Sequence, residues 1–263
     1  MSESSPLTGL LAGKKGLIVG VANQNSIAWG CAESLHAAGM ELAFTYQGET
    51  MRDRVTRTVA TLGGDVPLFD LDVRSDEQIS SVFAALQERW GTLDFVLHSV
   101  AFAPKPAMSN PFIETQREDF LTAHDISAYS LVALSRAAAP LMPNGGSIVA
   151  MTYYGSQKAV PGYNVMGVAK ASLEASVRYL AVDLGPRAIR VNAISAGAIN
   201  TLAARGVAHF RDLMKVTAER SPLKRTVETE EVGRATLFLA SDLSSGITGE
   251  TMYVDAGFNI TAG

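Results

Sequence analysis

The sequence predicts an α/β fold in which a doubly wound parallel sheet of about seven strands carries helices on both faces. Short apolar, β-rich runs alternate along the chain with amphipathic helical stretches, which is the pattern of strands joined by right-handed helical crossovers. Two of the runs, GLIVGV and FVLHSV, are apolar almost throughout, as expected for strands buried on both faces. No Pro- or Ser-rich linker divides the 263 residues, so we expect residues 1–263 to form a single domain.

The expected strands span nearly the whole chain. They are Gly16–Val21, Leu42–Tyr46, Val66–Val73, Phe95–Val100, Ser147–Thr152, Arg190–Ser195 and Thr251–Val254. In a Rossmann-type sheet of this kind, ligands bind outside the carboxyl ends of the strands, where the strand order reverses. The residues that directly follow each strand are therefore the candidates for a binding site.

Composition limits the partners and the location of the protein. The formal net charge is −4 and the sequence pI is about 5.6, which argues against nucleic acid or an anionic membrane surface as a partner. The N-terminal MSESSPLTGLLAGKK has an acidic residue before any basic one and only a short apolar stretch, unlike a signal peptide. We therefore expect a cytoplasmic protein with no stable membrane association.

Cysteine and histidine give no sign of a disulfide or a metal site. Cys31 is the only cysteine and lies in an apolar helical pattern, so we expect a small core residue rather than a reactive thiol. The four histidines are scattered, without the spacing of metal ligands. We expect no bound metal.

The turn after the first strand has the features of a dinucleotide cradle. Gly20 ends the strand and a helix begins near Ser26, so free helix amides and the positive end of the dipole are available to a pyrophosphate. Gly20 permits close approach of that group, and Ser26 can donate a hydrogen bond to it. Because the GxGxxG pattern is absent, an ordinary strand-to-helix turn remains an alternative on this segment alone.

The residues at the ends of the next strands also favour dinucleotide binding. Gln47 stands where an acidic residue usually binds an adenine ribose 2′-hydroxyl and a basic residue a 2′-phosphate. No Arg or Lys occupies the two following positions, which favours NADH over NADPH, although Arg52 and Arg54 are close in sequence. Asp72 and Val73 can contact the adenine, and the small residues from Ser99 through Val100 to Ala101 allow a ribose or nicotinamide close by.

Tyr163 and Lys170 are candidates for the reacting centre. Tyr163 opens a long helical pattern that ends near Gly185, and seven residues are nearly two turns, so both side chains share one face about 10.5 Å apart along the axis. The alternative is a helix-cap aromatic and a solvated lysine, but Lys170 is flanked by apolar residues. We expect a cofactor ribose to fit between the two, and the ammonium to lower the tyrosine pKa.

The spacing differs from the YxxxK of ketone-reducing short-chain dehydrogenases, in which the lysine follows the tyrosine by four residues. That position holds Gly167 here. One YxxxK does occur, from Tyr154 to Lys158, but Gly155 and Pro161 give it a poor helical context. We interpret it as unrelated to catalysis.

Together these segments resemble the enoyl-acyl carrier protein reductases of bacterial type II fatty acid synthesis, NADH-dependent members of the short-chain dehydrogenase/reductase superfamily. The resemblance covers nearly the whole chain. It rests on Gly20 with Ser26-Ile27-Ala28, FTYQ at 44–47, AHDIS at 123–127, Tyr153 with Tyr163 and Lys170, YNVMGVAKASLEASVRY from 163, and VNAISAGAINTLA at 191–203. One departure is Ala101, where many relatives carry glycine.

The resemblance implies a reaction and further site residues. Hydride passes from the nicotinamide to the β-carbon of a trans-2-enoyl thioester, Tyr163 stabilises the resulting enolate, and Lys170 binds the ribose hydroxyls. Tyr153, a further catalytic residue, and Ala103 are implied in the substrate pocket with Tyr163. Further cofactor contacts are implied at Ile27, Ile199, Asn200, Thr201, Leu202 and Ala203.

The resemblance also implies partners. A substrate-binding insertion is expected near 197–225, and its segment 205–225 carries six basic residues against two acidic ones. We interpret this excess as a docking site for the acidic acyl carrier protein, with a solvated helix face as the alternative. The C-terminal segment is expected to help build a homotetramer.

Two other functions remain open from the residues alone. A ketone or β-ketoacyl reductase on the same fold is disfavoured by the tyrosine–lysine spacing and by the lack of an upstream serine. A non-catalytic dinucleotide sensor would keep the cradle but does not need Tyr163 and Lys170 on one face.

Overall fold

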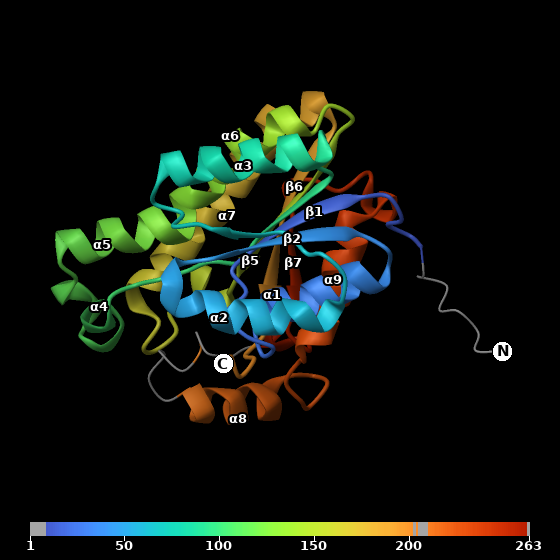
Figure 1. The fold of residues 1–263 in the computed structure, drawn as a ribbon. Coiled ribbons are helices and arrows are strands. Elements are labelled where there is room, and N and C mark those ends of the chain that lie inside the picture. Colours follow the sequence, from blue (N-terminus) through green and yellow to red (C-terminus); the bar gives the residue numbers. More distant parts are fainter. Residues whose placement is uncertain (1–8, 202–203, 205–209, 262–263) are drawn as a thin grey trace.

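The computed structural model describes residues 9–201, 204 and 210–261. These residues form one parallel seven-stranded sheet in the order β3-β2-β1-β4-β5-β6-β7 (Figure 1). The strands are β1 (Lys15–Val19), β2 (Glu41–Tyr46), β3 (Leu68–Asp70), β4 (Phe95–His98), β5 (Gly146–Thr152), β6 (Ile189–Ala196) and β7 (Thr251–Val254). The predicted fold class is confirmed.

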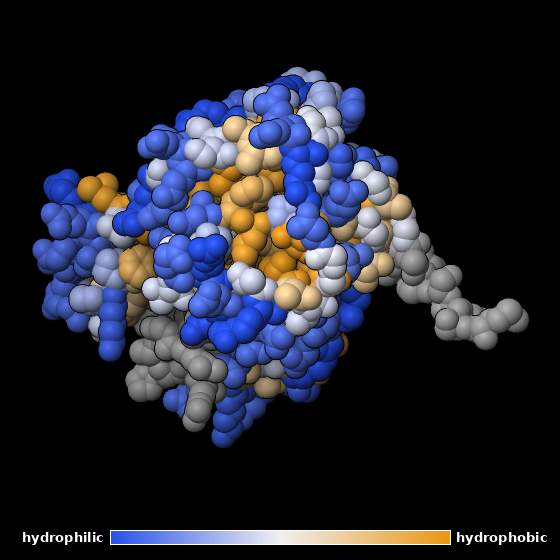
Figure 2. Space-filling model, in the orientation of Figure 1, coloured by the Kyte–Doolittle hydropathy of each residue, from blue (hydrophilic) through white to orange (hydrophobic). Residues whose placement is uncertain are grey.

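Helices cover both faces of the sheet. They are α1 (Ile27–Ala37), α2 (Gly48–Val59), α3 (Asp76–Trp90), α4 (Lys105–Ser109), α5 (Arg117–His124), α6 (Ser130–Ala138), α7 (Asn164–Leu184), α8 (Phe210–Arg220) and α9 (Thr229–Ala240). Figure 1 shows α3, α6 and α7 on one face and α1, α2 and α9 on the other. Each layer encloses its own apolar core against the sheet. Figure 2 shows a band of apolar side chains between the two layers, whose outer surfaces are mainly hydrophilic.

Three strands end earlier than the sequence predicted. We expected β1, β3 and β4 to continue through Val21, Val73 and Val100, but they end at Val19, Asp70 and His98. Most of the extra residues are apolar because they pack in the core or line the cleft described below, so hydrophobicity alone could not locate the strand ends. Each of these three predicted segments therefore consists of a strand followed by residues that pack beside it or line the cleft.

The strand order reverses at β1, which has β2 on one side and β4 on the other. In an open parallel sheet the crossovers on the two sides of such a point diverge and leave a crevice at the carboxyl ends of the strands. Helix α1 begins in this crevice directly after β1. The position of α1 thus decides the shape of the crevice.

Helix α1 is held by an unusually close crossing with α9. A Cβ added at Gly30 would lie 2.6 Å from Thr229 Cβ and 2.7 Å from the Thr229 carbonyl oxygen, and one added at Gly233 would clash with the Gly30 carbonyl. Glu228 and Glu231 form a capping box that fixes the start of α9 at this crossing. The two glycines therefore allow the helix backbones to touch.

Cys31 lies at the same interface and is fully buried. Its Sγ is 3.2 Å from Thr236 Oγ1, and burial raises the thiol pKa to about 12. The prediction of a core cysteine is confirmed.

Within the described residues, no group of three or more His, Cys, Asp or Glu side chains could hold a metal ion. No helix in the described ranges is long and apolar enough to cross a membrane.

We predict that Gly30→Ala destabilises the protein by about 1–3 kcal/mol, because the added methyl group overpacks the α1–α9 crossing. The sign is informative, since alanine is favoured over glycine by about 1 kcal/mol in an unconstrained helix. Urea unfolding followed by circular dichroism measures the effect. The matched control is Gly246→Ala, whose Cβ would meet nothing within 4 Å; equal stability of the two variants would contradict the close crossing.

Candidate active site

A cleft of about 1010 Å³ opens at the carboxyl ends of the strands. It brings together residues that are far apart in sequence but were predicted to share a site. The predicted residues among its lining are Gly20, Ile27, Gln47, Asp72, Val73, Ser99, Val100, Ala103, Tyr153, Tyr163, Lys170, Ile199 and Thr201. Ser26 and Asn200 do not line the cleft, and Leu202 and Ala203 lie outside the described residues.

Gly20 forms the wall of the cleft where β1 turns into α1. Its φ is +116°, and an added Cβ would clash with the carbonyl group of Ser99, so only glycine fits at this position. Ser26 supports the turn from below, because its Oγ accepts hydrogen bonds of 3.0 Å from the backbone N–H groups of Ala22 and Asn23. A narrow, preformed turn therefore precedes the free amides of α1, as a pyrophosphate site requires.

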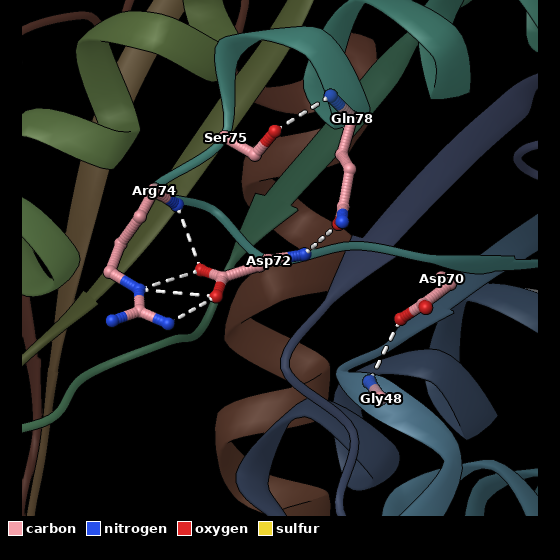
Figure 3. Close-up of polar contacts among 6 residues, drawn as sticks. All are labelled: Gly48, Asp70, Asp72, Arg74, Ser75 and Gln78. Atoms are coloured by element: carbon pink, nitrogen blue, oxygen red, sulfur yellow. Dashed lines mark hydrogen bonds and ion pairs between the residues drawn. The ribbon is translucent and has the colours of Figure 1, made fainter.

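Figure 3 shows the other end of the cleft, where an ion pair follows β3. Arg74 Nε donates to Asp72 Oδ1 at 3.0 Å, Arg74 Nη2 donates to Oδ2, and the Arg74 backbone N–H also donates to Oδ1. The guanidinium, with a smaller contribution from the Gln47 side chain, lowers the pKa of Asp72 to about 2. Asp72 is thus a fixed anion at physiological pH. The sequence did not single out Arg74. Only the folded structure shows that the side chains of Asp72 and Arg74 both line the cleft.

The cations near Gln47 are arranged differently from what their sequence positions suggested. Arg52 pairs with Glu49 at 3.4 Å on the exposed face of α2, and neither Arg52 nor Arg54 lines the cleft. Gln47 directly precedes the first turn of α2 and lines the cleft. The described wall at the end of β2 therefore presents a neutral amide.

A π-helical turn (Asp125–Tyr129) shapes the wall after β4. Ser127 Oγ accepts from the backbone N–H of Phe102 at 3.0 Å and lies 3.2 Å from its carbonyl oxygen. This serine therefore fixes the segment between β4 and Ala103. The AHDIS motif marked the place in the sequence, but a π-turn has no periodicity that would have revealed it.

The two predicted tyrosines meet in the cleft. Their ring centroids lie 4.9 Å apart at 72°, an edge-to-face contact. Tyr163 directly precedes α7, while Tyr153 directly follows β5. The structure therefore joins a strand end and a helix start at one point.

Glycines explain why the lysine does not follow Tyr163 by four residues. A Cβ at Gly155 would lie 2.9 Å from Tyr163 Cε1, and a Cβ at Gly167 would lie 2.6 Å from the Gly155 carbonyl oxygen. The turn after β5 thus lies directly against α7 where the YxxxK lysine would stand. Tyr154 packs edge-on against Phe258, Lys158 is exposed, and neither lines the cleft.

Lys170 is only 5% exposed, and its Nζ donates a 2.7 Å hydrogen bond to the Met151 carbonyl oxygen. Burial lowers its pKa to about 8, and Glu174 opposes this shift. Burial also raises the pKa of Tyr163 above its ordinary value and that of Tyr153 to about 12. The expected lowering of the tyrosine pKa was therefore wrong, because desolvation by burial dominates, and Tyr153 and Glu174 act in the same direction. Tyr163 is a neutral hydrogen-bond donor at physiological pH.

Described residues after β6 also line the cleft. Gly197, Ala204 and Leu213 contribute to the lining. Of the predicted basic residues here, Arg205 and the side chain of Arg211 lie outside the described residues. Lys215 lies 4.0 Å from Glu219, and Arg225 pairs with Glu231 at 2.7 Å. Part of the predicted positive charge is thus balanced locally.

Comparison with known proteins agrees with this geometry. The family model described as enoyl-(acyl carrier protein) reductase matches residues 20–259. Enoyl-(acyl-carrier-protein) reductase (NADH) 1 of Rhizobium meliloti is 52% identical over 96% of this chain and 92% of its own length, and the NADH enzyme of Bacillus subtilis is 50% identical over 96% and 98%.

Solved structures of related proteins share the fold of this chain. The Bacillus cereus enoyl-acyl carrier protein reductase with NADP+ and indole naphthyridinone has a TM-score of 0.95 and 48% identity, over 97% of this chain and all of that one. The Anaplasma phagocytophilum reductase in complex with NAD has a TM-score of 0.94 and 47% identity, over 97% of each chain. This chain belongs to the enoyl-(acyl carrier protein) reductase family.

Proposed function

We propose that the protein reduces the trans-2 double bond of enoyl-acyl carrier protein thioesters in fatty acid elongation, with NADH as the hydride donor. The observation that carries the proposal is the Tyr153–Tyr163 ring contact with buried Lys170 in the same cleft. Family membership gives the reaction class, and these side chains supply the chemistry for it.

The cleft fits a dinucleotide along its length. Gly20 leaves room for a pyrophosphate at the start of α1, Gln47 and Asp72 offer acceptors at the adenine end, and buried Lys170 can donate to ribose hydroxyls. We also assign Ile27, Val73, Ser99, Val100, Ile199 and Thr201 to cofactor contacts. When bound there, NADH supplies the hydride that reaches the β-carbon.

Tyr163 stabilises the charge that develops on the substrate. Hydride arrival at the β-carbon makes the thioester an enolate, whose oxygen needs a preorganised donor. Because burial keeps the Tyr163 hydroxyl protonated, it can donate without changing its own charge, and one such donor is worth about 3–4 kcal/mol in the transition state. Tyr153 and Ala103 line the adjoining part of the cleft, where we place the acyl chain. Protonation at the α-carbon then completes the reduction.

The test compares NADH oxidation by the purified protein with a trans-2-enoyl thioester and with a 3-ketoacyl thioester. We expect activity on the enoyl substrate and greater efficiency with NADH than with NADPH. Tyr163→Phe should lose about 100- to 1,000-fold in kcat at unchanged NADH affinity, because it removes one transition-state hydrogen-bond donor. Lys170→Ala should weaken NADH binding instead. Turnover of the ketone alone would indicate a ketone reductase, and NADH binding without turnover of either substrate would indicate a sensor.

We assign carrier-protein docking to the region of α8. Lys215 and Arg220 are exposed on this helix, and α8 stands apart from the two helix layers in Figure 1. Its Leu213 lines the cleft, so a carrier bound here would deliver its acyl group close to Tyr163. Opposite charges would steer an acidic carrier protein to this site.

Replacing Lys215 and Arg220 together by Glu should raise KM for the carrier-bound substrate by roughly tenfold, as lost steering predicts, and leave KM for an enoyl-coenzyme A ester unchanged. Steady-state kinetics with both substrates measures the difference. Arg57→Glu, an exposed reversal on α2, is the control. Equal effects on the two substrates would remove the docking assignment.

We further propose a cytoplasmic homotetramer. Helix α7 exposes Tyr179 and Val182 to 77% and 75%, and large apolar side chains grouped on one helix are typical of a subunit interface. Light scattering should give four times the mass of the chain, and a monomeric mass would contradict the proposal.

A further inference from the structure

Glu174 is a buried carboxylate to which the reaction described above gives no role. It lies on α7 one turn after Lys170 and is only 6% exposed. A buried charge is strongly unfavourable unless it is paired and hydrogen-bonded. Its surroundings therefore indicate what it does.

Two hydroxyl groups donate to the same oxygen of Glu174. Thr152 Oγ1 lies 2.7 Å from Oε1, and Ser156 Oγ lies 2.6 Å from it. These residues flank Tyr153, one at the end of β5 and the other in the turn that follows. Glu174 thus ties the segment that carries Tyr153 to the helix that directly follows Tyr163.

The charge of Glu174 also acts on Lys170. The two residues are four apart on one helix, so their side chains are neighbours, and both are buried. Burial lowers the pKa of Lys170 to about 8, while the carboxylate raises it. Without the carboxylate, the ammonium would be lost at a lower pH.

Other titratable groups around the pair do not replace this charge. On the sheet side, burial and then Lys170 lower the pKa of His98 on β4 to about 3, so it is neutral. Its Nε2 lies 2.7 Å from Ser130 Oγ on α6. Three tyrosines nearby, Tyr153, Tyr163 and Tyr253, have raised pKa values and are also neutral. Asp255 after β7 contributes to the raised pKa values of Tyr153 and Tyr253, whereas the carboxylate that acts on the pKa of Lys170 is Glu174.

We propose that Glu174 is a positioning residue of the active site. Its Oε1 holds Thr152 and Ser156 on either side of Tyr153, and its negative charge compensates the buried ammonium of Lys170. The inference rests on the proposed function, because it assigns Glu174 to the same tyrosines and lysine. It adds a residue that touches neither substrate nor cofactor.

Glutamine separates the two roles. Because both hydroxyls donate to one oxygen, the amide oxygen of Glu174→Gln can accept both bonds, while the charge is lost. The complementary variant combines Thr152→Val with Ser156→Ala, which removes both bonds and keeps the charge. Asp183→Asn, an exposed carboxamide exchange on the same helix, is the control for both.

The first measurement is the dissociation constant of NADH against pH, by fluorescence and without substrate. Wild-type affinity should weaken as pH rises through about 8, where Lys170 loses its proton. In Glu174→Gln the weakening should begin about one pH unit lower, which makes the dissociation constant about fivefold higher than that of the wild type at pH 8. A cooperative melting transition shows that Glu174→Gln is folded, and the NADH–pH profile of Asp183→Asn should match that of the wild type.

The second measurement is kcat on the enoyl thioester. The Thr152→Val/Ser156→Ala variant should lose about tenfold or more, because small displacements of a reacting group are costly in rate, while its NADH–pH profile stays that of the wild type. Superimposable profiles for Glu174→Gln and wild type would overturn the charge role, and wild-type kcat in the double variant would overturn the tie to Tyr153. A wild-type protein without enoyl turnover refutes the proposed function instead, and the substrate-free profile still decides the charge role.

Discussion

The close contact between the turn after β5 and the start of α7 is the constraint on which the active site depends. Gly155 lies against the Tyr163 ring, and Gly167 lies against the Gly155 backbone. No side chain fits at either position without movement, so the two segments approach closely enough for the rings of Tyr153 and Tyr163 to meet. The same contact excludes a lysine from position 167. The cationic group must then come from further along the helix. Lys170 supplies it, and its Nζ donates to the carbonyl oxygen of Met151 near the end of β5.

Burial controls the chemistry of these groups more than their mutual charges do. Desolvation raises the pKa of Tyr163 and lowers that of Lys170, so the tyrosine remains a neutral donor while the lysine is held close to its titration range. Such an arrangement suits a reaction in which negative charge appears briefly on an oxygen, because a fixed neutral donor needs no reorganisation when the charge develops. It also makes the lysine dependent on a compensating anion.

Periodicity in the sequence was sufficient for the fold and for most of the cleft, but not for contacts made by tertiary packing. The alternation of apolar strands and amphipathic helices predicted all seven strands, and the strand ends pointed to residues as distant as Gly20 and Thr201. Ser26, in contrast, supports the turn instead of lining the cleft. Arg74 was missed because only the folded structure shows that its side chain and that of Asp72 both line the cleft. The π-turn at Asp125–Tyr129 was missed because an irregular helix turn has no periodicity in the sequence. The tyrosine pKa was misjudged because burial cannot be read from neighbours in sequence.

The two ends of the cleft use charge in physically different ways. At the adenine end, Asp72 and Arg74 pair at the surface, where the Arg74 side chain is 52% exposed, so water and salt screen their field. At the reacting end, Lys170 and Glu174 are almost wholly buried, and removal of one charge leaves the other in a medium that screens it poorly. Loss of Arg74 is therefore tolerated by solvation of Asp72, whereas loss of the Glu174 charge must be answered by proton release from Lys170. Each end holds one carboxylate and one cation, so their different depths account for the different response to loss of a charge.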